Sequence, residues 1–387
     1  MHIFFIDQFI SLDMMAPIIY KLSKKNKVFI YNLNCAQSYS HTDIYKFLDK
    51  QRNIFFKKNL INYLSINLLV ILFIKLITLI PSKKINKNYK FWSYIWQNLI
   101  LISEKKLSNF VIKNKIKSIS IDESLPNKKR SFLFKFCKLL KIPLIMNHGG
   151  LYTLKAKLKN KKKFEENSFF LSPNKYPIFT YNFDKKYLNS GKYLELGSPR
   201  FDKSWLEIIK KIHPKKKSTE KLKIAFFVRP TSISYAEILD VLKKLEKLEK
   251  FEIKINYKPR DIFPTKYSNY NRNEMQSSEL ILWSDLVICY ASSIMVEAVC
   301  RDKPLIYVNY LKVVKKKEIS WFDQFRFIKK GRNLNHTIEL IKNFSLKDKS
   351  YVVKRKAKLI LLKKLISSNG KSSILKKYYT FYKKISI

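Results

Sequence analysis

The chain has 387 residues, of which 46% are hydrophobic and 14% aromatic, so it can bury the cores of two or three domains, and general disorder is excluded. Lysine and arginine total 78 against 29 acidic residues, and the net charge of +49 is spread along the whole chain. We interpret most of this excess as solvated lysines in a sequence rich in Lys, Ile and Asn. The alternative is attraction to phosphate in nucleic acid, anionic lipid or a nucleotide-linked substrate.

The four cysteines form no metal-binding pattern. They are scattered, with neither a CxxC motif nor the His/Cys spacing of a zinc site, and this usage suits a reducing cytoplasm. Residues 1–7 form a short apolar run without a basic region before it, so we expect no signal peptide. The predicted location is the cytoplasm, at the inner face of the cell membrane, because so basic a surface should adhere to anionic lipid.

Strand-like and helix-like patterns alternate along the first half of the chain. The continuous apolar runs are typical of strands that are buried on both faces of a parallel sheet. Strands separated by helices form right-handed crossovers, so the pattern predicts a parallel α/β sheet. The predicted strands are 2–7, 27–32, 116–122, 143–147, 178–181 and 193–196, and the predicted helices are 16–22, 91–102 and 130–140.

Residues 60–80 form a long apolar run, followed by Pro81 and a basic cluster. The run is just long enough to span a bilayer, but Asn62, Asn67 and Lys75 interrupt it, and both flanks look like parts of one folded domain. We therefore favour a helix at the membrane surface, with the lysines against anionic head groups. A buried core helix and a true membrane span are the alternatives.

A second strand–helix series follows a polar segment, residues 213–221, which is the predicted linker. Ser234 and Glu237 form a capping box before a helix with apolar residues at helical spacing. The remaining predicted strands are 223–228, 251–257, 286–291 and 304–310, the short helices are 277–283 and 294–301, and residues 351–382 form a basic helical tail. This doubling predicts an α/β fold of two Rossmann-like domains, 1–212 and 222–350, whose parallel sheets face a central cleft.

Residues 284–308, SDLVICYASSIMVEAVCRDKPLIYV, carry the strongest binding signal. A buried strand runs into Ser292 and Ser293, which open a helix. A helix N-terminus at the carboxyl end of a parallel strand offers free N–H groups and a positive dipole end to a phosphate. Glu297, one turn inside the helix, can face a ribose diol. The alternative is a serine cap and an acidic residue that stabilise the helix alone.

This stretch resembles the donor-binding segment of GT-B glycosyltransferases and the related nucleotide-sugar 2-epimerases. Their pattern is an aspartate before a strand, a small-residue turn, a helix with Glu, and Lys-Pro before the next strand. It is met here by Asp285, Ser292, Ser293, Glu297, Lys303 and Pro304. The resemblance implies that the serine turn holds the diphosphate, that the Glu binds the ribose, and that the tail, 351–387, crosses back to the first domain.

Two further motifs resemble capsule-type and CDP-glycerol glycerophosphotransferase-like proteins. The first is LGSPRFDKSW, 196–205, in which Arg200 could face the cleft and neutralise phosphate; the alternative is a surface pair with Asp202. The second is a His-Gly motif at a strand end, in which the resemblance implies that His148 is the base. Histidine suits proton transfer near neutral pH, although His148 could instead only hydrogen-bond a turn. Asp7, at the end of the first strand, is the second candidate for the base.

One departure concerns the second domain, where those proteins carry Lys-Pro-His. This chain has Lys258-Pro259-Arg260, and Arg260 can clamp a phosphate but cannot exchange protons. This favours sugar transfer over polyol-phosphate transfer. Arg229 follows the first strand of the second domain, where it could contact donor phosphates or belong to an ordinary polar loop.

The sequence therefore predicts a GT-B-type glycosyltransferase that moves a sugar from a nucleotide-diphosphate donor to a surface-polysaccharide or lipid-linked acceptor. Neither a Walker motif, GxGxxG, HExxH nor a DxD pair is present, so we expect no cofactor and no catalytic metal. The alternatives are a glycerophosphotransferase-like polymerase or a nucleotide-sugar 2-epimerase. A basic nucleic-acid-binding protein is the alternative of another class, but no known nucleic-acid motif supports it.

Overall fold

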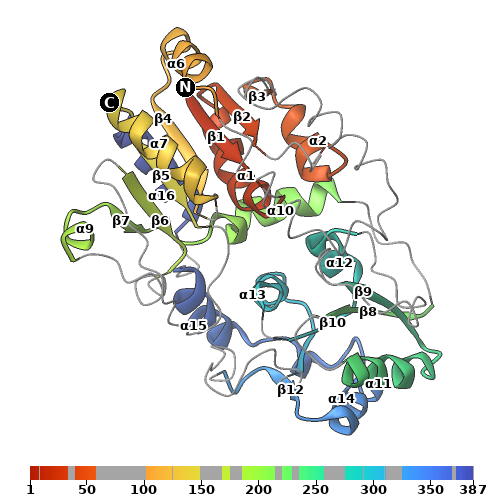
Figure 1. Ribbon diagram of the computed structural model, residues 1–387. Coiled ribbons are helices and arrows are strands. Elements are labelled where there is room, and N and C mark those ends of the chain that lie inside the picture. The colour runs from red at the N-terminus through yellow and green to blue at the C-terminus, as the bar shows by residue number, and fades with distance from the viewer. Residues whose placement is uncertain are drawn as a thin grey trace.

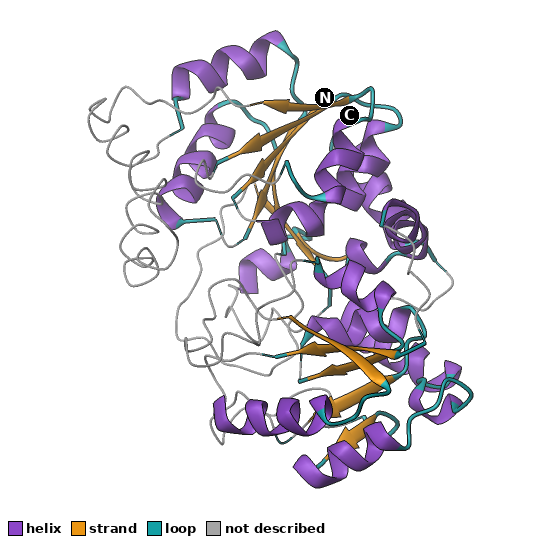
Figure 2. Ribbon diagram, turned by 90° about the vertical axis from the view of Figure 1, so that its right-hand side faces the viewer, coloured by secondary structure: helices purple, strands orange, loops and turns teal. Residues whose placement is uncertain are grey.

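Two separate parallel sheets, one above the other, organise the chain in the computed structural model (Figures 1 and 2). The structure describes residues 1–7, 9–33, 40–57, 102–123, 125–148, 168–174, 185–213, 220–228, 235–256, 275–290, 292–308, 310, 325–367 and 372–386. The predicted α/β fold of two Rossmann-like domains is confirmed. Residues 60–80 and the predicted elements 91–102 and 178–181 lie outside the described residues, as does most of the linker.

The first sheet has the strand order β3-β2-β1-β4-β5-β6-β7, and every pair in it is parallel. The chain moves outward from β1 to β3 and then returns to the other side of β1, so the strand order reverses between β1 and β4. Ligands of open α/β sheets bind at such a point, beyond the carboxyl ends of the strands. The strands are β1 (His2–Ile6), β2 (Val28–Asn32), β3 (Ile54–Lys57), β4 (Ser118–Asp122), β5 (Leu144–Asn147), β6 (Ser168–Ser172) and β7 (Tyr193–Glu195).

Helices cover both faces of the first sheet because the buried strands are apolar on both sides. In β1, Phe4 and Ile6 belong to one core cluster, while Ile3 and Phe5 belong to the cluster under α6 and α7 on the opposite face. The helices of this domain are α1 (Phe9–Ser23), α2 (Asp43–Asp49), α6 (Glu104–Lys113), α7 (Asn127–Leu139), α9 (Lys185–Asn189), the 3₁₀ turn η3 (Pro199–Phe201) and α10 (Lys203–Ile212).

The second sheet has the order β12-β11-β10-β8-β9 and is also parallel throughout. Its strand order reverses between β8 and β10, and α13 begins directly after β10, so α13 starts at the second point where a ligand is expected. The strands are β8 (Leu222–Phe227), β9 (Phe251–Asn256), β10 (Leu286–Cys289), β11 (Leu305–Val308) and β12 (Lys329–Gly331). The helices are α11 (Tyr235–Glu246), α12 (Ser277–Trp283), α13 (Ser293–Cys300) and α14 (Leu334–Lys342).

The C-terminal tail forms two helices that contact different domains. The first, α15 (Arg355–Ile366), packs against α13 of the second domain, whereas α16 (Ile374–Lys384) packs against α1 of the first. The Tyr382 hydroxyl lies 2.7 Å from Ser120 Oγ in β4, and both chain termini lie together at the first domain (Figure 2). One apolar cluster runs from β1 through α16 and α15 into α13 and β10, and so joins the two domains. The exact domain boundaries stay predictions.

The sequence pattern did not predict three of the short strands. β3 and β12 are edge strands of four and three residues, and β12 is Lys-Lys-Gly, which has no apolar signature. β6 was not predicted because its apolar run is short and has a serine at each end.

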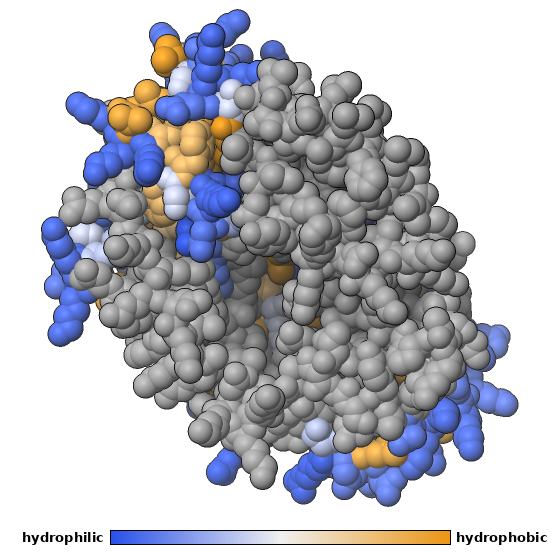
Figure 3. Space-filling model, viewed as in Figure 1, coloured by the Kyte–Doolittle hydropathy of each residue, from blue (hydrophilic) through white to orange (hydrophobic). Residues whose placement is uncertain are grey.

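The described surface shows apolar side chains among many lysines. On the face in Figure 3, an apolar area lies over α6 and α7 and is ringed by hydrophilic side chains. Ile112 and Leu139 are 67% and 73% exposed. None of the helices among the described residues is long and apolar enough to cross a membrane. Membrane-surface association stays a prediction.

The turn at Gly197 holds the tail against the first domain. Gly197 has φ +94°, and a Cβ there would lie 2.7 Å from the carbonyl oxygen of Ile366 and 3.1 Å from the Ile374 side chain. The Gly197 carbonyl also accepts a hydrogen bond from the Tyr378 hydroxyl at 3.0 Å. This position therefore needs glycine for both its backbone angle and the close approach of the tail.

Gly197→Ala is expected to destabilise the protein by about 1 kcal/mol through the positive φ and by about 1–3 kcal/mol more through the clash with the tail. Gly191→Ala is the matched control, because Gly191 has φ +71° but no atom lies within 4 Å of the place that its Cβ would take. Urea denaturation of both variants measures the difference. Equal losses in the two would show that the tail does not pack on this turn.

Candidate functional site

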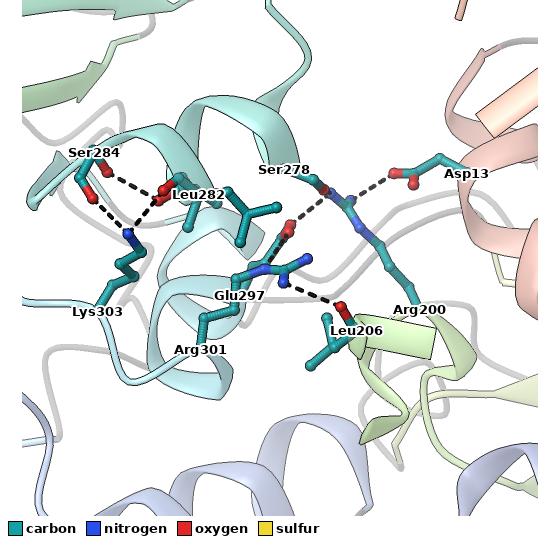
Figure 4. Close-up of polar contacts among 10 residues, drawn as sticks. Asp13, Arg200, Leu206, Ser278, Leu282, Ser284, Glu297, Arg301 and Lys303 are labelled. Atoms are coloured by element: carbon teal, nitrogen blue, oxygen red, sulfur yellow. Dashed lines mark hydrogen bonds and ion pairs between the residues drawn. The ribbon is translucent and has the colours of Figure 1, made fainter. Parts of the chain in front are cut away.

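A buried cluster of charges joins the two domains at Arg200 (Figure 4). Arg200 Nη1 lies 3.0 Å from Asp13 Oδ2 in α1, and Arg200 Nη2 donates a hydrogen bond to Glu297 Oε2 in α13 at 2.9 Å. Glu297 Oε1 accepts a further bond from Arg301 Nε at 3.1 Å, and Arg301 Nη1 donates to the Leu206 carbonyl of α10. Two cations and two carboxylates therefore compensate one another across the domain junction.

The elements explain why these side chains meet. Arg200 lies in η3, immediately after the turn at Gly197, and is only 9% exposed. Glu297 lies inside α13 and is 1% exposed, and Arg301 follows it four residues later on the same face of the helix. Ser278, in α12, adds a long contact of 3.5 Å to Arg200.

The protonation states follow from this pairing. Burial alone would raise the pKa of Glu297, but Arg200 and Arg301, with Ser278, hold that pKa below its usual value. Burial dominates at Asp13 and raises its pKa, although Arg200 opposes the shift. Burial would lower the pKa of Arg200, but Asp13 and Glu297 raise it, so this guanidinium stays charged.

The alternative of a surface pair between Arg200 and Asp202 is wrong. Asp202 caps α10 by accepting hydrogen bonds from Ser204, and its other oxygen accepts from Ser373 Oγ at 2.8 Å and from the backbone N–H of Leu375 at 3.1 Å. Arg200 thus binds the second domain while Asp202 binds the start of α16. The LGSPRFD turn organises the junction of both domains and the tail.

The first turn of α13 follows the carboxyl end of β10, where a ligand of the second sheet is expected. Ser292 is the N-cap residue, but its side chain makes no capping hydrogen bond, and no described residue offers its buried Oγ a hydrogen-bond partner. Glu297 lies beyond the first turn, so it does not stabilise the helix start in the way the alternative required. Glu297, as folded here, binds two arginines, and the ligand contacts of Ser292, Ser293 and Glu297 stay predictions.

A second group of ionisable side chains gathers where the strand order of the first sheet reverses. His148 Nε2, after β5, lies 3.6 Å from Glu123 Oε1, after β4, and Asp7 Oδ1, after β1, lies 3.6 Å from Lys129 Nζ of α7. Each of these side chains is under 10% exposed. Burial raises the pKa of the Asp7 carboxyl, Lys129 opposes the shift, and Asp122 at the end of β4 adds to it. Ionisable side chains thus line the carboxyl end of the first sheet, and we call Asp7, Asp122, Glu123 and His148 the acid–base edge.

The ion-pair cluster around Arg200 connects the acid–base edge of the first sheet to the start of α13 in the second domain. Asp13 lies in the second turn of α1, the helix that follows Asp7, and Arg200 ties it to Glu297, one turn inside the helix that Ser292 caps. The acid–base edge of the first sheet and the α13 turn of the second therefore approach each other at the domain junction (Figure 1).

Other motif residues have structural positions or lie outside the description. Asp285 accepts a hydrogen bond from the backbone of Lys223 and so ties β10 to β8, and Lys303 donates to the carbonyls of Leu282 and Ser284 (Figure 4). Arg229, Lys258 and Arg260 are outside the described residues.

The sequence reasoning missed several members of the site. They are Asp13, Glu123, Lys129, Ser278 and Arg301. Only Arg301 carried a signal, its spacing of four residues from Glu297.

Several solved structures share this fold at low sequence identity. A UDP-N-acetylglucosamine 2-epimerase has a TM-score of 0.56 at 9% identity, over 99% of this chain and 94% of that one. The UDP-GlcNAc 2-epimerase of Neisseria meningitidis, bound to UDP-GlcNAc, has a TM-score of 0.50 at 12% identity, over 93% and 97%. The wall teichoic acid polymerase TagF, with CDPG, has a TM-score of 0.52 at 13% identity, over 99% and 88%.

This likeness confirms the resemblance to GT-B-type enzymes at the level of the fold. The sequence matches no model of a protein family and no curated protein.

Proposed function

We propose that this protein is a GT-B-type glycosyltransferase that takes a sugar from a nucleotide-diphosphate donor to a surface-polysaccharide or lipid-linked acceptor. The observation that carries the proposal is that two groups of polar side chains, which we assign to the donor and to the base, lie on the two sides of the domain junction. One is the α13 turn with its unpartnered Ser292 hydroxyl among the described residues, and the other is the buried edge with His148, Glu123 and Asp7. The structures similar in fold include proteins bound to UDP-GlcNAc or soaked with CDPG.

The donor diphosphate would lie against the first turn of α13. Free N–H groups and the helix dipole favour an anion there, and the hydroxyls of Ser292 and Ser293 add donors. Arg229, Lys258 and Arg260 follow β8 and β9 in the sequence, and we assign them to the phosphate charge. These groups would stabilise the leaving diphosphate without a catalytic metal.

The acceptor hydroxyl would lose its proton to His148. A transfer with inversion needs one base within hydrogen-bonding reach of the attacking oxygen. Glu123, 3.6 Å from His148 Nε2, would orient the ring and stabilise the imidazolium as it forms. Asp7 is the alternative base, since its burial raises its pKa toward neutrality.

A second candidate is a nucleotide-sugar 2-epimerase. The observation that favours it is the number of ionisable groups at one edge, because Asp7, Asp122, Glu123 and His148 exceed what a single deprotonation needs. Epimerisation removes a proton from carbon and returns one on the other face, and so requires two acid–base groups. Exchange of the sugar C2 hydrogen with solvent deuterium, in the absence of any acceptor, would identify an epimerase, and acceptor-dependent release of nucleotide would identify a transferase.

The first test is a thermal-unfolding screen with UDP, GDP, CDP, CMP and their sugar conjugates at moderate salt. A ligand at 100 times its Kd should stabilise the folded protein by about 2.7 kcal/mol. We expect one nucleotide class to raise the Tm, and the Ser292→Ala/Ser293→Ala variant to lose that shift. Ser103→Ala, which removes the N-cap of α6, is the matched control and should keep it. A shift with nucleic acid alone would overturn the proposal.

A further inference from the structure

A histidine and two carboxylates from three distant segments meet at the boundary between the domains. Asp43 is the first residue of α2, His213 ends α10, and Glu279 lies in the first turn of α12. One ligand atom of each residue lies within 4.8 Å of those of the other two. The first two belong to the first domain and the third to the second, so the group bridges the junction where the linker begins (Figure 1).

The bonds within this group do not use up its donors and acceptors. His213 Nδ1 lies 3.1 Å from Asp43 Oδ2, but no described residue offers a hydrogen-bond partner to the buried Nε2 of the same ring. His213 is only 4% exposed, so leaving a ring nitrogen without a partner is costly. Glu279 Oε2 accepts a long bond from the backbone of Gln276, which leaves Oε1 available. The ring and the two carboxylates therefore have spare capacity.

The backbone holds the three side chains in place. The Thr42 side chain caps α2 just before Asp43, and the His213 N–H bonds the Ile209 carbonyl at the end of α10. Glu279 is fixed by its capping box, and its neighbour Ser278 contacts Arg200. Preorganised ligands bind a metal ion more tightly than mobile ones because less side-chain entropy is lost.

We propose that Asp43, His213 and Glu279 bind a divalent transition-metal ion, with Zn²⁺ as the best fit, that bridges the two domains. Zinc takes one histidine nitrogen and two carboxylate oxygens at about 2.0–2.2 Å, and ligand atoms that already lie within 4.8 Å of one another can reach that geometry by small side-chain movements. Imidazole disfavours Mg²⁺ and Ca²⁺, which prefer oxygen ligands alone. Water would complete the coordination. The residues are distinct from those assigned to the donor and the base, so this ion is a structural link.

Isothermal titration of the full chain, stripped of metal with a chelator, tests the site directly. We expect one Zn²⁺ per chain, binding at least ten times weaker in His213→Gln and in Glu279→Gln. His336→Gln is the matched control, because His336 lies on α14, outside the group, and should bind as the parent does. Co²⁺ should give ligand-field absorption bands that the two site variants lose, and Mg²⁺ should not compete.

Each remaining outcome overturns the proposal. Absence of stoichiometric Zn²⁺ binding would mean that Asp43 and His213 form only a hydrogen-bonded pair. Binding that survives in both site variants would place the ion elsewhere. If His213→Gln does not fold, Glu279→Gln and Asp43→Asn decide the question, since both residues are partly exposed and both changes preserve side-chain shape.

Discussion

Arg200→Met is expected to lower the free energy of unfolding by about 3–5 kcal/mol, because it leaves two buried carboxylates without their shared cation. Among the described cations Glu297 would keep Arg301, and Asp13 would lose the partner 3.0 Å away. Urea denaturation followed by tryptophan fluorescence measures the loss. Arg355→Met is the matched control, since Arg355 is exposed at the start of α15 and its change should cost less than about 0.5 kcal/mol.

A second variant separates charge burial from packing. In Arg200→Met/Asp13→Asn the buried carboxylate that lost its partner is gone, while Glu297 keeps its ion pair with Arg301, so part of the loss should return. A loss no larger than in Arg355→Met, or no recovery in the double variant, would mean that the charge pairing does not hold the domains together.

The same pairing sets the pH dependence. The folded protein holds the pKa of Glu297 below its usual value, so the folded state binds fewer protons there than the unfolded state. The stability from this group is present above the unfolded value, about 4.3, and is lost as pH falls through the lower folded value. The stability gap between the parent and Arg200→Met should therefore narrow below about pH 4.3, where the carboxylates take up protons.

His148→Ala is expected to lower kcat by about 10²–10⁴-fold while leaving the Kd of the donor nucleotide unchanged. The residue lies at the acid–base edge of the first domain, whereas the proposed phosphate contacts belong to α13 and the second domain. Steady-state turnover with the donor identified by thermal unfolding, together with titration of the nucleotide alone, measures the two effects. His336→Ala is the control and should change neither.

Companion variants assign the roles within the edge. Glu123→Gln should lower kcat less than His148→Ala and shift the pH profile, because it changes the partner of the ring and leaves the ring itself in place. Unchanged turnover in His148→Ala, with turnover lost in Asp7→Asn, would transfer the role of base to Asp7.

Local patterns in the sequence were enough for the architecture. Continuous apolar runs separated by amphipathic segments indicate buried parallel strands and crossover helices, and β1, β4, β5, β8, β10 and β11 were predicted close to their observed bounds. The same patterns put Asp7, His148 and Ser292 at the carboxyl ends of strands, because a strand end is a local property and the ends of parallel strands share one edge. Short polar edge strands such as β12 carry no such pattern.

The tertiary structure alone decided which charges meet. Arg200 and Glu297 are 97 residues apart, and Asp43 and His213 are 170 apart. No periodicity links such residues, since their contact depends on how η3, α10, α12 and α13 pack across the junction. The sequence indicated that Arg200 and Glu297 lie near a cleft and assigned each to a ligand. In the folded chain they neutralise each other, because a single buried charge is costly and an opposite charge beside it compensates much of that cost.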